Sequence, residues 1–267
     1  MPEGKTEAFR AMHRGIQVLL LPNAWDVASA RVIQQAGFGA IATTSAGIAF
    51  SLGYPDGQRI SRQEMLEAVR RMASAVQVPV TADVEAGYGV RPEDAACTAQ
   101  DVLAAGAVGM NLEDATGDPK RPLLDLALQV ERVKAVRALP IVLNARTDVY
   151  LLEIGEPERR YDEALRRLAA FRDAGADCVF VPGLRDPESI GRMVRDLRCP
   201  VNILAGPGFP PVPELQKLGV ARVSLGSGPM RATLGLLRRL AEELRNAGTY
   251  ATLEGAIPYP ELNRMME

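Results

Sequence analysis

Acidic side chains at the ends of predicted strands are the first feature of this sequence with chemical meaning. Asp83 and Glu85 follow the apolar run 78–82, and Glu113 follows the next one. Strand side chains alternate, so Asp83 and Glu85 should share a face. Clustered carboxylates repel unless a cation or proton compensates them, and an all-oxygen cluster favours a hard cation. These three residues therefore predict a site for Mg²⁺, or Mn²⁺ in its place, although strand-end acids also pair with arginine or loop backbones.

Further polar residues at strand ends suit an anionic ligand. Arg146 ends the strand after the Glu113 strand, and its planar guanidinium can bind a carboxylate or a phosphate. Ser45, Ala46 and Gly47 follow the second strand, where a turn of small residues can aim N–H groups at an anion, although a tight connecting loop would use the same residues. Asn202 ends the seventh strand and is another candidate for substrate binding.

The composition narrows the function classes. The chain has 267 residues, 47% of them hydrophobic, and a net charge of −2, so it is globular and has no charge excess that would attract nucleic acid or a membrane surface. A single histidine, His13, excludes a Ser-His-Asp triad and a multi-histidine metal site. Three cysteines without a C-x-x-C pair fit a reducing cytoplasm. No run approaches the ~20 apolar residues that span a bilayer.

The elements that must position the polar residues alternate along the chain. Eight runs rich in Val, Ile and Leu have the length of buried strands: residues 18–21, 40–43, 78–82, 109–112, 141–144, 178–181, 201–204 and 222–225. Segments with helical periodicity separate them, such as 62–75. Ser61, just before this segment, and Glu64, within its first turn, have the spacing of a capping box. The pattern predicts an α/β fold, a (β/α)₈ TIM barrel with catalytic groups at the carboxyl strand ends, with a doubly wound sheet as the alternative.

We expect one barrel domain spanning residues 1–267, with residues 249–267 as a C-terminal extension. Pro258-Tyr259-Pro260 interrupts this extension, and residues 261–266 can form a short helix. Its apolar residues, Leu262 and Met265, need a surface to cover, either on their own barrel or on a neighbouring subunit. The extension therefore predicts a homo-oligomer.

Five short stretches, taken together, resemble the isocitrate lyase/phosphoenolpyruvate mutase superfamily over about residues 20–240. They are Pro22-Asn23-Ala24-Trp25-Asp26, Thr44-Ser45-Ala46-Gly47, Asp83-Val84-Glu85-Ala86-Gly87-Tyr88-Gly89, Leu112-Glu113-Asp114 and Ala145-Arg146-Thr147-Asp148. The resemblance implies a (β/α)₈ barrel, commonly in tetramers whose subunits exchange a C-terminal helix. It thus gives the helical tail a purpose and predicts a homotetramer.

The resemblance also implies a role for each candidate residue. Asp83 is expected to be the direct Mg²⁺ ligand, and Glu85 and Glu113 to hold metal-bound waters. The turn of Ser45, Ala46 and Gly47 is expected to receive the substrate carboxylate. Arg146 matches the substrate-binding arginine. Asp56, in Gly53-Tyr54-Pro55-Asp56-Gly57, matches a loop aspartate near the reacting group.

Departures from the family pattern narrow the chemistry. The lyase branch carries a loop with Cys and His after the fourth strand, but residues 115–122 here contain neither. Cleavage of isocitrate or methylisocitrate by that mechanism is therefore not expected, and the Asn-containing gating segment of the mutase branch is not evident either. Glu85 stands where the family usually has Asp, and Gly183-Leu184-Arg185 stands where it has a His.

These residues favour a Mg²⁺-dependent carbon–carbon lyase, a carboxy-lyase like oxaloacetate decarboxylase, acting on a small 2-oxo dicarboxylic acid. Decarboxylation needs only a stabilised enolate and then a proton, so the missing Cys is not required. Two alternatives stay open. One is a C–P bond enzyme, either a phosphonopyruvate hydrolase or a phosphonomutase acting on phosphoenolpyruvate or carboxyphosphonoenolpyruvate. The other is a protein that binds 2-oxo acids with little turnover.

Overall fold

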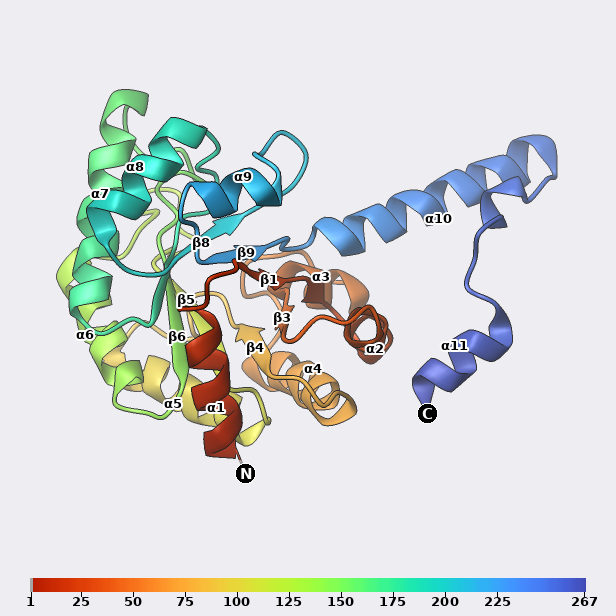
Figure 1. Ribbon diagram of the computed structural model, residues 1–267, viewed down its shortest axis with the longest axis horizontal. Coiled ribbons are helices and arrows are strands. Elements are labelled where there is room, and N and C mark those ends of the chain that lie inside the picture. Colours follow the sequence, from red (N-terminus) through yellow and green to blue (C-terminus); the bar gives the residue numbers. More distant parts are fainter. Residues whose placement is uncertain (1) are drawn as a thin grey trace.

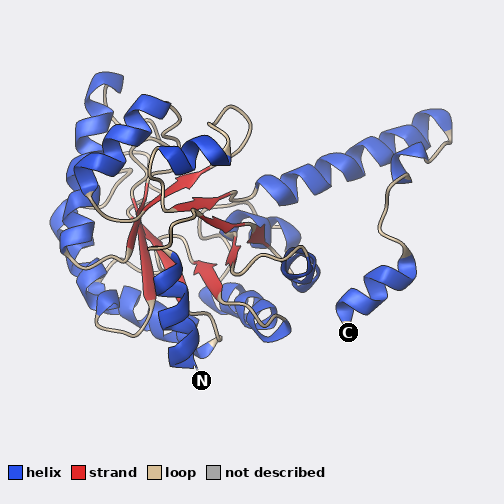
Figure 2. Cartoon of the chain, viewed as in Figure 1, coloured by secondary structure: helices blue, strands red, loops and turns tan. Residues whose placement is uncertain are grey.

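The computed structural model describes residues 2–267, with side chains from residue 4 onward, as parallel strands surrounded by helices (Figures 1 and 2). Within this described part the sheet has nine strands. They are β1 (Leu19–Leu21), β2 (Asn23–Ala24), β3 (Ile41–Thr43), β4 (Val80–Asp83), β5 (Gly109–Glu113), β6 (Val142–Arg146), β7 (Cys178–Phe180), β8 (Val201–Leu204) and β9 (Arg222–Ser224).

The strand order closes the sheet into a barrel. All pairings are parallel, and the order is β1-β9-β8-β7-β6-β5-β4-β3-β2. β1 and β2 follow each other in the chain, separated by Pro22, which has no N–H to donate. β1 pairs with β9 and β2 pairs with β3, so the two pieces act as one barrel strand that joins the sheet edges. The predicted (β/α)₈ barrel is confirmed.

Helices follow the strands, as the periodicity predicts. The helices of the barrel are α2 (Val27–Gln35), α3 (Ser45–Ser51), α4 (Arg62–Ala75), α5 (Pro92–Ala104), α6 (Leu126–Arg137), α7 (Pro157–Asp173), α8 (Pro187–Leu197), α9 (Val212–Lys217) and the start of α10 (Gly228–Ala247). Ser61 and Glu64 form the predicted capping box of α4. The apolar faces of the helices cover the outer face of the barrel with buried Val, Leu, Ile and Met.

A helix that the sequence analysis does not predict, α1 (Pro2–Met12), lies at the amino-terminal end of the barrel (Figure 1). Phe9 is fully buried there against Leu21 and Val142. His13 is also buried, with its Nδ1 2.9 Å from the carbonyl oxygen of Phe9, so its role is packing. The other residues of α1 are mostly charged or polar, so the sequence pattern does not reveal this helix.

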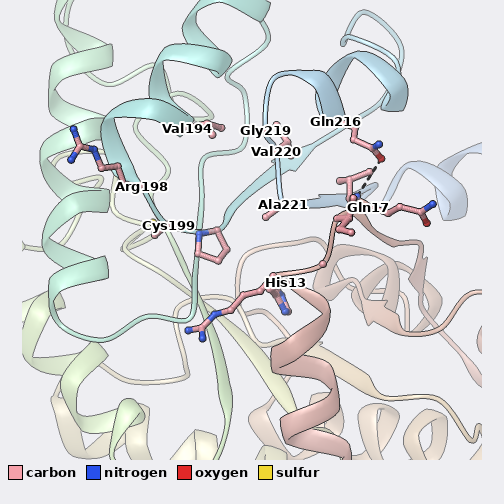
Figure 3. A pocket seen from close by; sticks show the side chains of 14 residues that line it. His13, Gln17, Val194, Arg198, Cys199, Gln216, Gly219, Val220 and Ala221 are labelled. Atoms are coloured by element: carbon pink, nitrogen blue, oxygen red, sulfur yellow. Dashed lines mark hydrogen bonds between the residues drawn. The ribbon is translucent and has the colours of Figure 1, made fainter.

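A cavity of about 440 Å³ lies at the same end, between the C-terminus of α1 and the segments before β8 and β9 (Figure 3). Its lining includes His13, Cys199, Pro200 and Ala221. These residues precede strands. The cavity therefore lies at the end of the barrel opposite the carboxyl strand ends, where barrel enzymes place their chemistry.

The C-terminal part leaves the barrel. α10 extends away from it, and the chain returns through η1 (Ala251–Leu253) to α11 (Tyr259–Met266) (Figure 1). α11 includes residues 261–266, which were predicted to form a short helix. It contacts α2 of its own chain, where Nη1 of Arg31 donates to the carbonyl of Met265 at 3.1 Å. The exchange of this tail between subunits stays a prediction. None of the described helices is long and apolar enough to cross a membrane.

Candidate active site

The candidate residues gather at the carboxyl ends of β3 to β6. Asp83 is the last residue of β4, Glu113 the last of β5 and Arg146 the last of β6. Register pairs Asp83 with Asn111 and Glu113 with Arg146 across neighbouring strands. All four side chains therefore point into the barrel from adjacent strands, which places the predicted acids and the predicted arginine around one mouth.

Asp83 is the best-held carboxylate of the mouth. It is 9% exposed, and its Oδ2 accepts hydrogen bonds from the N–H of Ser45 at 3.1 Å and from the hydroxyl of Ser45 at 2.9 Å. Its Oδ1 accepts from Nδ2 of Asn111 at 3.2 Å. None of its described contacts is an ion pair, so neutral donors hold the carboxylate in place, while Arg146 and Arg222 act on it from farther away.

The segment of Ser45, Ala46 and Gly47 is the first turn of helix α3 rather than a free turn. Thr44 caps this helix, and its side chain accepts from the N–H of Gly47 at 3.3 Å. A Cβ at position 47 would lie 2.5 Å from Thr44 and 3.0 Å from Trp25, so packing requires a glycine. Ser45 uses its N–H on Asp83. The expectation of a small-residue loop is therefore wrong, because the strand runs directly into a capped helix.

Glu85 lies beyond the end of β4, where the alternation of strand side chains no longer applies. Its backbone is left-handed, with φ of 53°, and turns its carboxylate back toward Asp83. Oε2 accepts from the N–H of Gln58 at 2.5 Å, whereas Oε1 is buried without a partner among the described groups. Burial first, then repulsion by Asp83 and Asp56, raises the pKa of Glu85 to about 7.

This shift predicts a pH-dependent gain in stability for Glu85→Gln. The folded pKa of about 7 exceeds the ordinary 4.5, so the folded carboxyl keeps its proton longer than the unfolded one. Charging Glu85 therefore destabilises the folded state above pH 7 by on the order of 2 kcal/mol, and this penalty fades as pH falls toward 4.5. In urea titrations with chelator, Glu85→Gln should be more stable than wild type at pH 8 and nearly equal at pH 4.5. An equal gain at both pH values would contradict the assignment.

Arg146 is engaged by two buried carboxylates. Its Nε and Nη2 lie 2.5 and 3.0 Å from the two oxygens of Asp148, and its Nη1 lies 2.8 Å from Oε2 of Glu113. Burial raises the pKa of Glu113, and Arg146 opposes that rise. Asp148 and Glu113 raise the pKa of Arg146 in spite of its burial. The guanidinium is thus fixed by protein acids, and a substrate can use only the N–H groups that remain.

A third buried acid, Asp114, holds the segment that follows Arg146. The carboxylate of Asp114 is fully buried and accepts from the hydroxyl of Thr147 at 2.7 Å, the N–H of Asp148 at 3.0 Å and Nη1 of Arg167 at 3.1 Å. Burial raises the pKa of Asp114 to about 6. Arg167 comes from α7, so this helix fixes the segment that in turn fixes Arg146.

Asp56 lies in the loop between α3 and α4, at the rim of the mouth. Its side chain reaches solvent, yet the surrounding protein partly desolvates it and Asp83 repels it, and both effects raise its pKa. Arg146 acts on it in the opposite direction. Asp56 thus feels the charges of the mouth, and its part in the reaction stays a prediction.

Asn202 is the candidate residue without a described contact to the acids of the mouth. It is fully buried inside the barrel, where its amide exchanges 3.3 Å contacts with the hydroxyl of Ser224. Below Asp83 lies a buried arginine, Arg222, whose Nη2 is 3.5 Å from Oδ1 of Asn111. The described contacts of Asn202 include none of the mouth acids, so its role in substrate binding stays a prediction.

Although Asp114 and Asp148 lie within the stretches that carry the family resemblance, sequence reasoning gave no role to several residues that shape the mouth: Gln58, Asn111, Asp114, Asp148, Arg167 and Arg222. For two of them a signal exists. Asn111 lies two residues before Glu113 in a strand, and the period of two places it on the same inner face. Asp148 lies two residues after Arg146. Arg167 carries no such signal, because its partner Asp114 is 53 residues away in the chain.

The residues of the mouth fit a hard divalent cation. Asp56, Asp83, Glu85, Glu113 and Asp148 act on one another across the mouth, and two buried arginines, Arg146 and Arg222, act on these acids. The unpartnered Oε1 of Glu85 leaves an oxygen ligand free. In the described part of the chain, no three His, Cys, Asp or Glu side chains converge closely enough to chelate a metal. The donors present at the mouth are carboxylate oxygens, the kind of ligand that Mg²⁺ prefers.

Comparison with known proteins identifies the family. A sequence model described as phosphoenolpyruvate phosphomutase matches residues 9–245. The chain belongs to this family and so to the isocitrate lyase/phosphoenolpyruvate mutase superfamily, whose lyases, mutases and hydrolases include relatives of this chain. The predicted resemblance is confirmed.

Individual relatives cover nearly the whole chain. An uncharacterized protein of Mycobacterium tuberculosis is 36% identical over 252 residues, 94% of this chain and 92% of its own. An oxaloacetate decarboxylase of Rhodopseudomonas palustris is 29% identical over 262 residues, 93% of this chain and 87% of its own.

Solved structures agree with this placement. A candidate lyase/mutase from Burkholderia cenocepacia J2315 superposes with a TM-score of 0.93 at 40% identity, covering 98% of this chain and 95% of its own. A phosphonopyruvate hydrolase in complex with oxalate and Mg²⁺ superposes with a TM-score of 0.86 at 25% identity, covering 98% of this chain and 94% of its own. The superfamily therefore includes a homologous structure with bound Mg²⁺.

Proposed function

We propose that this protein is a Mg²⁺-dependent carbon–carbon lyase that acts on a small 2-oxo dicarboxylic acid, with the decarboxylation of oxaloacetate as its simplest reaction. The observation that carries the proposal is the acid-rich barrel mouth, in which the carboxylate of Asp83 forms no described ion pair and Glu85 keeps a free oxygen. The likeness to an oxaloacetate decarboxylase over 93% of the chain supports the choice of reaction.

Asp83 would hold the cation directly, and Glu85 and Glu113 would hold its waters. This division agrees with the absence of a converging three-acid cluster in the described residues. When bound, the cation supplies Lewis acidity, polarising the keto group and offsetting the charge that develops when the neighbouring bond breaks. Mn²⁺ has the same preference for oxygen ligands and is expected to substitute.

The chain's own residues then orient the substrate and move the proton. The start of α3 would receive one carboxylate chiefly through the N–H of Ala46, because the N–H groups of Ser45 and Gly47 already donate to Asp83 and to the side chain of Thr44. Arg146 would bind the other through its remaining N–H groups. Loss of CO₂ leaves the bonding electrons on the adjacent carbon, which then takes one proton. Asp56, whose pKa is raised by partial burial and by Asp83, is suited to deliver that proton.

The loop after β5 supports decarboxylation over isocitrate-type cleavage. Residues 115–122 contain neither Cys nor His. They form a self-bonded hairpin in which Ala115 pairs with Leu123 and the N–H of Thr116 donates to the carbonyl of Pro122 at 2.9 Å. A proton-handling thiol is therefore missing from this hairpin, whereas decarboxylation does not need one.

A second candidate reaction is cleavage of a C–P bond in a phosphonopyruvate-like acid. It is favoured by the likeness to phosphonopyruvate hydrolase, whose complex with oxalate and Mg²⁺ shares this fold. The same mouth would serve it, because the substrate presents the same 2-oxo acid group.

One assay panel separates these proposals. The protein, with Mg²⁺, is incubated with oxaloacetate, 2-oxoglutarate, phosphonopyruvate and methylisocitrate. Pyruvate released from oxaloacetate above the metal-only background is the expected result. Phosphate or phosphoenolpyruvate formed from phosphonopyruvate would favour the second reaction instead. Saturable binding without turnover would leave only a 2-oxo acid binding protein.

We further propose that the chain assembles into a homo-oligomer, a tetramer by the family resemblance, through α10 and the tail. Leu234, Leu237 and Leu244 lie on one face of α10 and are 43%, 58% and 49% exposed. In the tail, Tyr250 and Tyr259 are more exposed still. A helix that leaves the barrel with an apolar stripe needs a partner surface, and a second copy that receives the tail would supply it.

Sedimentation tests this assembly. Wild type at micromolar concentration should sediment at a multiple of the mass of one chain, and Leu237→Asp should shift it to smaller species, because the charge lies in the middle of the stripe. Exposed Glu242, on the same helix, provides the control variant Glu242→Gln, which should sediment as wild type does. A wild-type monomer would contradict the proposal.

A further inference from the structure

The loop that carries Asp56 is anchored at its two ends but not around Asp56: the N–H of Tyr54 donates to the carbonyl of Ala49 at 2.9 Å, and Ile60 is buried in the core. Residues 52–61 join α3 to α4, and residues 52–57 are exposed. The carboxylate of Asp56 accepts from the N–H of Gly57, its neighbour in the chain, and this contact does not tie the loop to the barrel. Another residue must therefore keep Asp56 beside the mouth.

Gln58 makes two hydrogen bonds that could do this. Its backbone N–H donates to Oε2 of Glu85 at 2.5 Å, and its side-chain Oε1 accepts from the backbone N–H of Tyr88 at 2.8 Å. Among the described residues, no other hydrogen bond or ion pair joins the loop 52–61 to the segment 84–89. Gln58 thus joins the two loops from both its backbone and its side chain.

The segment on which Gln58 docks is itself held firmly. Arg132 of α6 donates to the carbonyls of Ala86 and Gly89, and the hydroxyl of Thr98 of α5 donates to the carbonyl of Gly87 at 2.8 Å. The Gln58 loop docks onto a segment fixed by two helices, so it is the moving partner of the contact.

The backbone at the contact is unusual. Gln58, Glu85 and Tyr88 have φ of 55°, 53° and 54°, a left-handed conformation that residues with a Cβ adopt only when their surroundings hold them. Three such residues meet at this one contact. The two hydrogen bonds of Gln58 therefore hold a conformation that the loop would otherwise leave.

We propose that Gln58 is a positioning residue that pins the 52–61 loop to the Glu85–Tyr88 turn and so holds Asp56 over the mouth. The proposal rests on the proposed function, in which Asp56 delivers the proton. Loss of the side-chain acceptor removes one hydrogen bond of the pin and releases the strained backbone, so the loop opens while the barrel stays folded.

Trypsin measures this opening directly, because Arg59 follows Gln58 in the same loop. Gln58→Met keeps the side-chain length without the acceptor, and Gln58→Ala removes both. Both variants should be cut after Arg59 about tenfold faster than wild type, since cleavage follows the population of the open loop. Their kcat/KM for the 2-oxo acid turned over should fall about tenfold, mainly in kcat, while the thermal midpoint stays within about 2 °C of wild type. Exposed Gln77, which lies outside the loop, gives the matched control Gln77→Ala, with neither change expected.

The outcomes separate the pin from the proposed function. Cleavage within twofold of wild type in both Gln58 variants would overturn the pin. Faster cleavage with unchanged kcat would overturn the role of the pin in placing Asp56. A wild type that turns over none of the tested acids would count against the proposed function alone, because the trypsin comparison decides the pin without any turnover.

Discussion

Asp83→Asn should abolish Mg²⁺-dependent ligand binding and reduce turnover by about 10³-fold, which corresponds to the several kcal/mol of charge stabilisation that a catalytic metal ion supplies. Neutral donors hold the carboxylate of Asp83, and no described ion pair engages it. The amide has the same shape, so the strand end keeps its packing. Calorimetric titration with oxalate in the presence of Mg²⁺ measures the loss.

A matched control separates the site from general effects of charge. Asp162 on α7 is exposed and has no described hydrogen bond or ion pair, so Asp162→Asn should bind and turn over as wild type does. Far-ultraviolet circular dichroism of Asp83→Asn should match wild type, although its stability can fall by about 1–3 kcal/mol because Ser45 and Asn111 lose a charged acceptor. Unchanged Mg²⁺ dependence in Asp83→Asn would remove the metal assignment.

Arg146→Met should impair both stability and turnover. Its removal leaves Glu113 and Asp148 buried without their cation, and breaking such a buried pair costs about 3–5 kcal/mol. Turnover should fall by about 10²-fold or more, because the substrate loses its guanidinium partner. The loss of stability should shrink as pH falls, since protonation neutralises Glu113, whose pKa burial raises.

Urea unfolding at pH 8 and pH 5, together with the turnover assay, measures both losses. Arg146→Lys keeps the charge but not the two-pronged contact with Asp148, so it should recover more stability than activity. Arg91 pairs with Asp94 on the exposed surface of the barrel, and Arg91→Met should change little because water screens that pair. Equal losses in Arg91→Met and Arg146→Met would show that burial does not set the strength of the Arg146 contacts.

The fold could be read from the sequence because burial on both faces leaves a strong pattern. Each of the eight predicted runs overlaps an observed strand, and 201–204 matches β8 in full. The capping box at Ser61 also marked the start of α4 correctly. α1 was missed, because a helix whose described buried residues are Phe9 and Thr6 leaves too few apolar residues to reveal its periodicity.

The sequence predicted only those site residues that lie at the ends of strands. Asp83, Glu113 and Arg146 end neighbouring strands, so their meeting follows from the barrel alone. The position of Glu85 did not follow from strand alternation, because the strand ends at Asp83 and a left-handed turn redirects the chain.

The partners of the site residues were also beyond the sequence. The capture of Arg146 by Asp148 and the support of Asp114 by Arg167 depend on side-chain conformation and on contacts between distant helices. Periodicity carries no information on either. Only the structure shows that two protein acids hold the guanidinium of Arg146, so that a substrate must share it with them.

An anomalous-scattering map of crystals soaked with Mn²⁺ and oxalate tests the central claim most directly. We expect one strong peak at the barrel mouth, about 2.2 Å from a carboxylate oxygen of Asp83, with oxalate bound beside it. A mouth without a peak, with Asp83 drawn into the ion pairs of Arg146, would contradict the proposed lyase and leave only the barrel.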